Sequence, residues 1–159
     1  MEQINRKSLK YLKSFVFCLL AFIMLIGCES NHTSGIYNTW ICTNRKGPIL
    51  VINENGPYYQ YNKQTNREIN YFSGTKADVK SGQDALNEVK KVKPQIISKN
   101  VEHFYSVKFY FDKYIDENGK NQSKLIQKGE NWWYIFQIVG NGRADVLNMN
   151  TGETFFVEV

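Results

Sequence analysis

Apolar and polar residues alternate with a period of two along much of the chain after residue 35. The apolar positions are rich in aromatic and β-branched residues, which fit the half-buried surface of a β-sheet. Short segments with Gly, Asn or Pro separate these runs and mark turns. The pattern predicts strands at residues 36–43, 49–53, 58–62, 68–72, 105–115, 123–128, 132–139, 143–149 and 154–159.

Turn sequences predict how these strands pair. Asn55-Gly56 separates the second and third strands, and an Asn-Gly pair tolerates the positive φ of a tight hairpin. Asn118-Gly119 and Asn141-Gly142 are similar turns in the C-terminal third. Because short connections place consecutive strands side by side, residues 105–159 are expected to form an antiparallel meander of five strands. The fold class is therefore mainly β, with about eight or nine strands that close into a barrel or form two layers.

The same alternation predicts which side chains face the core, because successive residues of a strand point to opposite faces. The residues expected to face inward are Trp40, Cys42, Tyr105, Val107, Phe109, Phe111, Ile115, Trp132, Tyr134, Phe136, Ile138, Phe155, Val157 and Val159. On the strand at 105–115, Ser106, Lys108 and Asp112 occupy the opposite face.

Several aromatic residues do not fit this inward face. They are Phe104, Tyr110 and Tyr114 in the strand at 105–115, and Tyr58, Tyr59 and Tyr61 in an N-terminal hairpin. Two interpretations are open. These rings line a ligand cavity or stacking surface, or both faces of the sheet are partly covered; we favour the second.

One segment has helical rather than strand spacing. Ala85, Leu86, Val89 and Val92 fall on one face of a helix near residues 82–93. Ser81 and Asp84 resemble a capping box at its start, Lys90, Lys91 and Lys93 suit the negative end of the helix dipole, and Pro94 is expected to stop it. This short amphipathic helix should pack on the sheet or close one end of a barrel.

The most apolar stretch precedes all of these elements. Four cations, Arg6, Lys7, Lys10 and Lys13, are followed by twelve apolar residues at 15–26. A helix needs about 20 such residues to span a bilayer, so the run is too short for a permanent membrane span. Cationic start and short apolar run together indicate a secretory signal peptide.

The end of this run resembles the lipobox of bacterial lipoproteins, in the sequence Leu25-Ile26-Gly27-Cys28. The resemblance covers residues 1–28. It implies that Cys28 receives a diacylglycerol, that a peptidase removes residues 1–27, and that the new amine is acylated. Two or more acyl chains anchor a protein stably to a membrane, whereas a single acyl chain binds only marginally. We therefore expect a lipidated tether at 28–34, a single β-rich domain at 35–159, and a lipid-anchored location in the bacterial cell envelope after export from the cytoplasm.

Removal of the signal changes the apparent charge. The whole chain has 20 cations and 15 anions, and residues 1–27 hold four of the cations and one anion. The mature part therefore has a net charge of +2, with scattered Lys and Arg residues, which does not indicate a nucleic-acid partner. Cys18 leaves with the signal and Cys28 carries lipid, so Cys42 is unpaired and is expected to act as a small buried apolar residue.

Candidate catalytic and metal-binding residues are few. His32 lies in the tether, and His103 precedes a strand beside Glu102. Asp112, Asp116, Glu117 and Asn118 surround a glycine but lack the ligand spacing of an EF-hand, so a solvated turn is the better interpretation. We find no cofactor motif or metal-ligand spacing and expect a protein that is not an enzyme.

The mature part also resembles, in architecture, the lipocalin-like domains of bacterial lipoproteins. A first strand with Gly35 and Trp40 and a β-meander over 35–159 carry this likeness. It implies a small antiparallel barrel that binds an apolar ligand. Two functions are therefore considered: a non-catalytic module that binds a protein partner, which we favour, and a carrier of a small apolar molecule. A carrier needs a cavity of roughly 300 Å³ or more.

Overall fold

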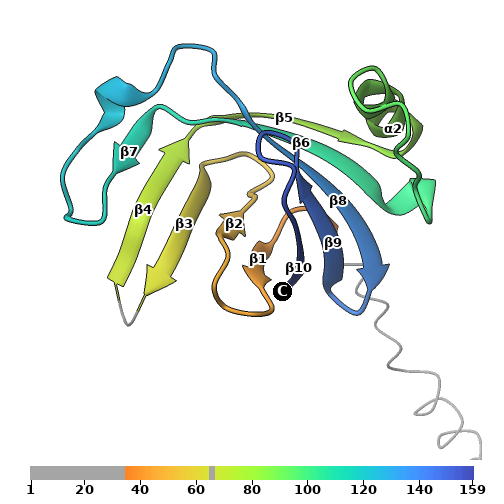
Figure 1. Ribbon diagram of the computed structural model, residues 1–159, viewed down its shortest axis with the longest axis horizontal. Helices are drawn as coiled ribbons and strands as arrows, with labels where there is room; N and C mark the ends of the chain where they lie inside the picture. Colours follow the sequence, from red (N-terminus) through yellow and green to blue (C-terminus); the bar gives the residue numbers. More distant parts are fainter. Residues whose placement is uncertain (1–34, 65–66) are drawn as a thin grey trace, which may run out of the picture. The chain divides into compact units, whose positions relative to one another are not determined.

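The computed structural model describes residues 35–64 and 67–159; the predicted signal peptide, lipobox and tether lie outside these residues. The described part contains ten strands, one α-helix and two 3₁₀ helices, so the predicted mainly β class is confirmed (Figure 1). Their bounds are β1 Thr39–Cys42, β2 Ile49–Val51, β3 Tyr58–Gln64, β4 Arg67–Gly74, β5 Lys76–Ser81, α2 Gly82–Lys90, η1 Val101–His103, β6 Phe104–Tyr110, β7 Lys113–Ile115, η2 Ser123–Leu125, β8 Trp132–Gly140, β9 Arg143–Asn148 and β10 Thr154–Glu158.

The ten strands form one antiparallel sheet in the order β5-β6-β8-β9-β10-β1-β2-β3-β4-β7. β4 and β5 are consecutive in the chain, as are β6 and β7, and the β4–β7 pairs continue the register of the β5–β6 pairs. For example, Phe72 faces Tyr114 and Lys76 faces Tyr110, which is the same offset. Two long bent strands therefore pair along their length. If β4–β5 and β6–β7 are each counted as one strand, the sheet has eight strands and its last strand pairs with its first, as in a barrel.

The two long strands bend where their backbones come closest. A Cβ atom at Gly74 would clash with the carbonyl oxygen of Tyr110 and lie 3.0 Å from the Cα atom of Phe111. The Asp112 N–H donates to the carbonyl of Ser73 over 3.0 Å, just beyond this point. Only glycine fits such a close approach, and it allows the sheet to curl as Figure 1 shows.

The inner face of the curled sheet carries the main core cluster. Its buried members are Ile36, Trp40, Leu50, Ile52, Tyr58, Val107, Phe109, Phe111, Tyr134, Phe136, Ile138, Ala144, Val146 and Val157. The predicted inward faces of β6 and β8 are confirmed, as is the buried position of Cys42. Val159 is an exception: it is 56% exposed, because β10 ends one residue before it.

The predicted five-stranded meander at 105–159 is wrong in two respects. The chain leaves the predicted strand at Phe111, and β7 pairs with β4, while β6 pairs directly with β8. Residues 123–128 form η2 and a loop instead of a strand. Here the Ser123 hydroxyl accepts a hydrogen bond from the backbone of Tyr114 and donates to Asn121, and such local side-chain bonds compete with a strand ladder.

Strand β5 was not predicted. Its apolar positions are only Ala77 and Val79, which pack against the main core cluster between charged residues. The weak alternation of Lys76–Ser81 was the available signal. The other predicted strands are present with shifted ends, and the Asn55-Gly56 turn joins β2 and β3 as an antiparallel pair.

The predicted helix packs on the outer face of the sheet, as expected. Ala85, Leu86 and Val89 of α2 contact Phe104 and Ile135 in a second core cluster. The helix ends at Lys90, four residues before Pro94, and Val92 is therefore 65% exposed rather than packed. Ser81 stands at the N-cap position without a side-chain capping bond, so the predicted capping box does not form.

Candidate functional site

The structure describes only some of the residues that the sequence suggested as candidate site residues. Cys28 and His32 lie outside the described residues. His103 ends η1, where its carbonyl accepts a hydrogen bond from Gln137. Among the described residues, no group of three or more His, Cys, Asp or Glu side chains is arranged to hold a metal ion.

The acidic segment around Asp116 forms a tight turn. The Gln122 amide and the backbone N–H groups of Lys120 and Asn118 donate to its carboxylate. These bonds lower the pKa of Asp116, with Gln122 contributing most. The carboxylate is thus occupied by hydrogen-bond donors of its own loop.

Of the six aromatic residues that did not fit the predicted inward face, two are buried and four are half-buried, which agrees with the favoured interpretation. Phe104 is buried beneath α2, and the ring of Tyr110 lies 4.8 Å from the Lys76 ammonium. The ring of Tyr114 stacks on that of Phe72, with 4.2 Å between the ring centres. Phe72 in turn packs against the main core cluster. Tyr114 therefore lies on the inner side, contrary to prediction, because the bend at Phe111 interrupts the alternation.

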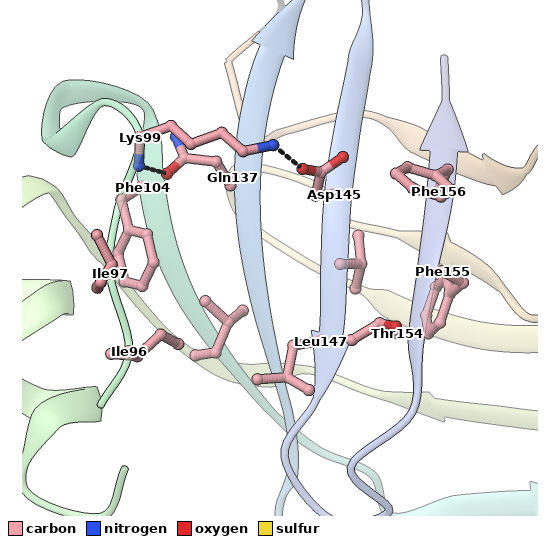
Figure 2. A pocket seen from close by; sticks show the side chains of 12 residues that line it. Ile96, Ile97, Lys99, Phe104, Gln137, Asp145, Leu147, Thr154, Phe155 and Phe156 are labelled. Atoms are coloured by element: carbon pink, nitrogen blue, oxygen red, sulfur yellow. Dashed lines mark hydrogen bonds and ion pairs between the residues drawn. The ribbon is translucent and has the colours of Figure 1, made fainter. Parts of the chain in front are cut away.

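A groove lies on the outer face of the sheet, between the segment that follows α2 and strands β8 to β10. Its volume is about 270 Å³. Figure 2 shows the segment on one side and the outward residues of the three strands as the floor and the opposite side. The apolar side chains that define it are Ile96, Phe104, Ile135, Leu147 and Phe156.

Strand register explains why these side chains meet. Ile135 faces Leu147, and Leu147 faces Thr154, in one row across three strands. The next row contains Gln137, Asp145 and Phe156. In the first row, Ile135 and Leu147 belong to the second core cluster and Thr154 ends the row, whereas the second row places two polar groups beside a phenyl ring.

Gln137 holds the opposite wall of the groove in place. Its side-chain oxygen accepts bonds from the Ser98 hydroxyl at 2.7 Å and the Lys99 N–H at 3.0 Å. Its amide donates to the carbonyl groups of Asn100 at 2.9 Å and His103 at 3.2 Å. One nearly buried amide thus satisfies four groups of an irregular segment, which fixes that segment against β8.

The two rims of the groove differ in chemistry. The Lys99 ammonium forms an ion pair with the Asp145 carboxylate at 2.7 Å, and this pair crosses one end of the groove (Figure 2). On the far side, Phe156 is 65% exposed although it is a large apolar residue. The arrangement can bury an apolar side chain and offer charged partners at one end.

A second polar cluster joins α2 to the sheet. The Glu88 carboxylate accepts from Lys80 at 2.7 Å, Lys108 at 2.8 Å and the Ser106 hydroxyl at 2.7 Å. Trp133 donates to the same hydroxyl, and the Lys108 ammonium lies 4.4 Å from the Trp133 ring centre. All three of these hydrogen bonds come from side chains of the sheet, so the cluster fixes the helix on the sheet.

The pKa of Glu88 reflects this environment. Burial alone raises the pKa, but the hydrogen bonds from Lys108, Lys80 and Ser106 outweigh burial and lower it to about 2. The pKa of Lys80 is raised, mainly by its hydrogen bond to Glu88. The carboxylate therefore stays ionised at all but strongly acidic pH.

Sequence reasoning did not single out Gln137 or Glu88. Gln137 interrupts an otherwise apolar run in β8, and a polar residue at such a position is a signal of a buried polar anchor. Glu88 lies next to the apolar positions of the helix, and Lys108 had been placed on the outer strand face. The sequence did not reveal that α2 covers that same face.

Comparisons with family models, curated proteins and solved structures give no match for this chain. Within residues 35–64 and 67–159, no helix has the length and apolar character to cross a membrane.

Proposed function

We propose that this protein is a non-catalytic lipoprotein of the bacterial cell envelope, anchored through lipid on Cys28, and that its outer groove binds a protein partner. The observation that carries the proposal is the groove with Phe156 at its edge. A solvent-exposed phenyl ring beside an apolar floor is unfavourable in isolation and becomes favourable when another surface covers it.

The size of the groove supports a partner that inserts side chains. Pockets for small molecules measure roughly 300–1,000 Å³ and enclose most of the ligand. The groove, at about 270 Å³, falls below that range and is partly open to solvent. A carrier of an apolar molecule would also use the inner face of the sheet, and the main core cluster packs that face with side chains such as Trp40 and Phe109.

The chemistry of the groove defines the partner it suits. Its floor takes an aliphatic or aromatic side chain, as interface anchors commonly are. The Lys99–Asp145 pair at one end provides a donor and an acceptor for polar groups that flank the anchor. We therefore expect a partner surface with an apolar side chain between polar neighbours.

The anchor is tested by labelling. Wild-type protein and the Cys28→Ala variant are expressed with a labelled fatty acid, and membrane and soluble fractions are compared. Only the wild type is expected to incorporate the label and to fractionate with membranes. Equal labelling of the two proteins would contradict the lipoprotein proposal.

The groove is tested by site-specific crosslinking. A photoreactive amino acid at position 156 is compared with one at Leu125, which is 63% exposed and does not line the groove. Position 156 is expected to crosslink to a defined partner protein. That partner, once purified, should bind the wild type at least tenfold more tightly than it binds the Phe156→Ser variant. Identical crosslinks from both positions, or equal binding by both proteins, would exclude the groove as the site.

A further inference from the structure

The segment after α2 combines positive charge with exposed apolar residues. Residues 89–101 contain Lys90, Lys91, Lys93 and Lys99 and no acidic residue. The same stretch exposes Val92, at 65%, and Ile97, at 87%. We call residues 90–99 the basic segment.

The two exposed residues are held outward by a fixed backbone. The Lys93 N–H donates to the Val89 carbonyl at 2.8 Å, and the Ile96 N–H donates to the Lys93 carbonyl at 3.1 Å. Gln137 fixes the end of the segment, as described above. Figure 2 shows the Ile96 side chain directed toward β8, with Ile97 on the other side of the chain. Ile97 also lines the groove, at its rim, and its side chain is 87% exposed, whereas Ile96 packs against the second core cluster.

We propose that the basic segment is a second membrane contact, in which Val92 and Ile97 enter the interface of an anionic bilayer and the lysines bind lipid phosphates. The proposal rests on the lipid anchor of the proposed function. The seven residues 28–34 reach at most about 25 Å, so the anchor keeps the domain near the bilayer. Attraction of lysines to anionic lipids acts within a Debye length of about 8–10 Å.

The charges around the segment favour an anionic surface. Lys99 pairs with Asp145, which leaves Lys90, Lys91 and Lys93 as the cations of the segment. The nearest acid before it, Glu88, already binds Lys80 and Lys108. The nearest acid after it, Glu102, belongs to η1 beyond the basic segment.

Residue types favour lipid over protein as the ligand. Protein interfaces are enriched in aromatic residues, Met and Arg and depleted in Lys, whereas membrane-surface segments combine Lys with apolar side chains. The basic segment contains only Lys as its charged residue type and only aliphatic residues as its exposed apolar ones. The experiment must therefore distinguish binding to a lipid surface from binding to a protein surface.

The test places an environment-sensitive fluorophore on the full chain, purified with its lipid and reconstituted into vesicles. Cys42 is buried and Cys28 carries the lipid, so a cysteine introduced at Ile97 is the labelling site. Leu125→Cys is the matched control, since Leu125 is 63% exposed and lies beside Lys124. Vesicles contain phosphatidylglycerol or only phosphatidylcholine, with and without spin-labelled lipids that quench at shallow depth.

The expected result is a blue shift and quenching at position 97 on anionic vesicles only, reduced by high salt, with no change at position 125. Replacing Lys90, Lys91 and Lys93 with Gln should lower the ratio of inserted to exposed label on the order of a hundredfold. A label at position 97 that stays in water on anionic vesicles overturns the inference, as does equal insertion at both positions.

Failure of the anchor is scored separately, by the mass of the purified chain. If Cys28 lacks lipid, the chain is labelled again with Cys18→Ser and Cys28→Ser added, so that Ile97→Cys stays the labelling site, and it is added to vesicles from solution. Insertion at position 97 then supports the basic segment although the anchor is wrong, and absence of insertion overturns the segment as well.

Discussion

The two faces of β8 carry similar apolar residues but meet different surroundings. Tyr134 and Phe136 point inward, where side chains from strands around the whole ring fill the space. Ile135 and Trp133 point outward and are covered only by α2 and the segment after it. Burial of the inward residues follows from the curl of the sheet. Burial of the outward residues depends on two local covers, which are α2 and the segment after it.

The difference teaches how the outer groove arises. Polar side chains attach each cover: Glu88 fixes α2, and Gln137, together with the Lys99–Asp145 pair, fixes the segment that ends in η1. Neither cover extends over β10, so Phe156 remains exposed. The inner face is thus committed to stability, and the uncovered part of the outer face is available for binding.

The largest expected effect comes from breaking the inner face. Phe136 is fully buried and its ring lies 5.7 Å from that of Trp40. Phe136→Ala removes these contacts and leaves a cavity, so we expect the free energy of unfolding to fall by about 3–5 kcal/mol. Urea denaturation measures it, with the exposed Phe156→Ala as the matched control. A loss below about 1 kcal/mol at Phe136 would show that the inner face is not the main source of stability.

Breaking the attachment of α2 should have the next effect. Glu88→Gln leaves Lys108 without a carboxylate and leaves Lys80 with only Asp78, at 3.8 Å, and we expect a loss of about 2–3 kcal/mol at neutral pH. The pKa of Glu88 is lower in the folded protein, about 2 against the ordinary 4.5, so its contribution is complete above pH 4.5 and is lost as pH falls toward 2. Unfolding curves of both proteins from pH 7 to pH 2 should therefore converge at low pH. A difference that persists unchanged at pH 2 would contradict the role of the ionised carboxylate.

A smaller effect is expected at the other attachment. Gln137→Leu leaves the Lys99 N–H and two carbonyl groups without their partner, at a cost of about 1–3 kcal/mol. Hydrogen exchange should also accelerate at the Lys99 amide, while amides of β8 and β9 change little. Unchanged exchange at Lys99 would mean that the segment is held by its other contacts.

The smallest effect on stability should come from the groove edge. Phe156→Ala is expected to change the free energy of unfolding by no more than about 0.5 kcal/mol, since the ring is largely exposed. Thermal unfolding measures this, and the variant should still lose partner binding. A large loss of stability would instead assign Phe156 to the core.

The period-two pattern was sufficient to predict the mainly β class, most strands and the inner face, because alternation is set by the backbone. It failed where local chemistry or a bend decided the structure. Ser123 and Asn121 turn a predicted strand into η2, and Gly74 permits a bend whose partner is far away in sequence. The groove also depends on which cover lies over which strands, and residue spacing alone contains no such information.

The ring of strands also sets an order of events during folding. Its seam joins β1 to β10, where Ile41 pairs with Glu158 and Cys42 with Val157 across more than one hundred residues of chain. Closing so long a loop costs chain entropy before any contact compensates it, whereas hairpins such as β8–β9 close locally. The seam should therefore form last, and the amide of Thr43, which donates to Phe156, should exchange faster than those of β8. A domain whose ring of strands closes only when its final strand joins stays open until the whole chain is available.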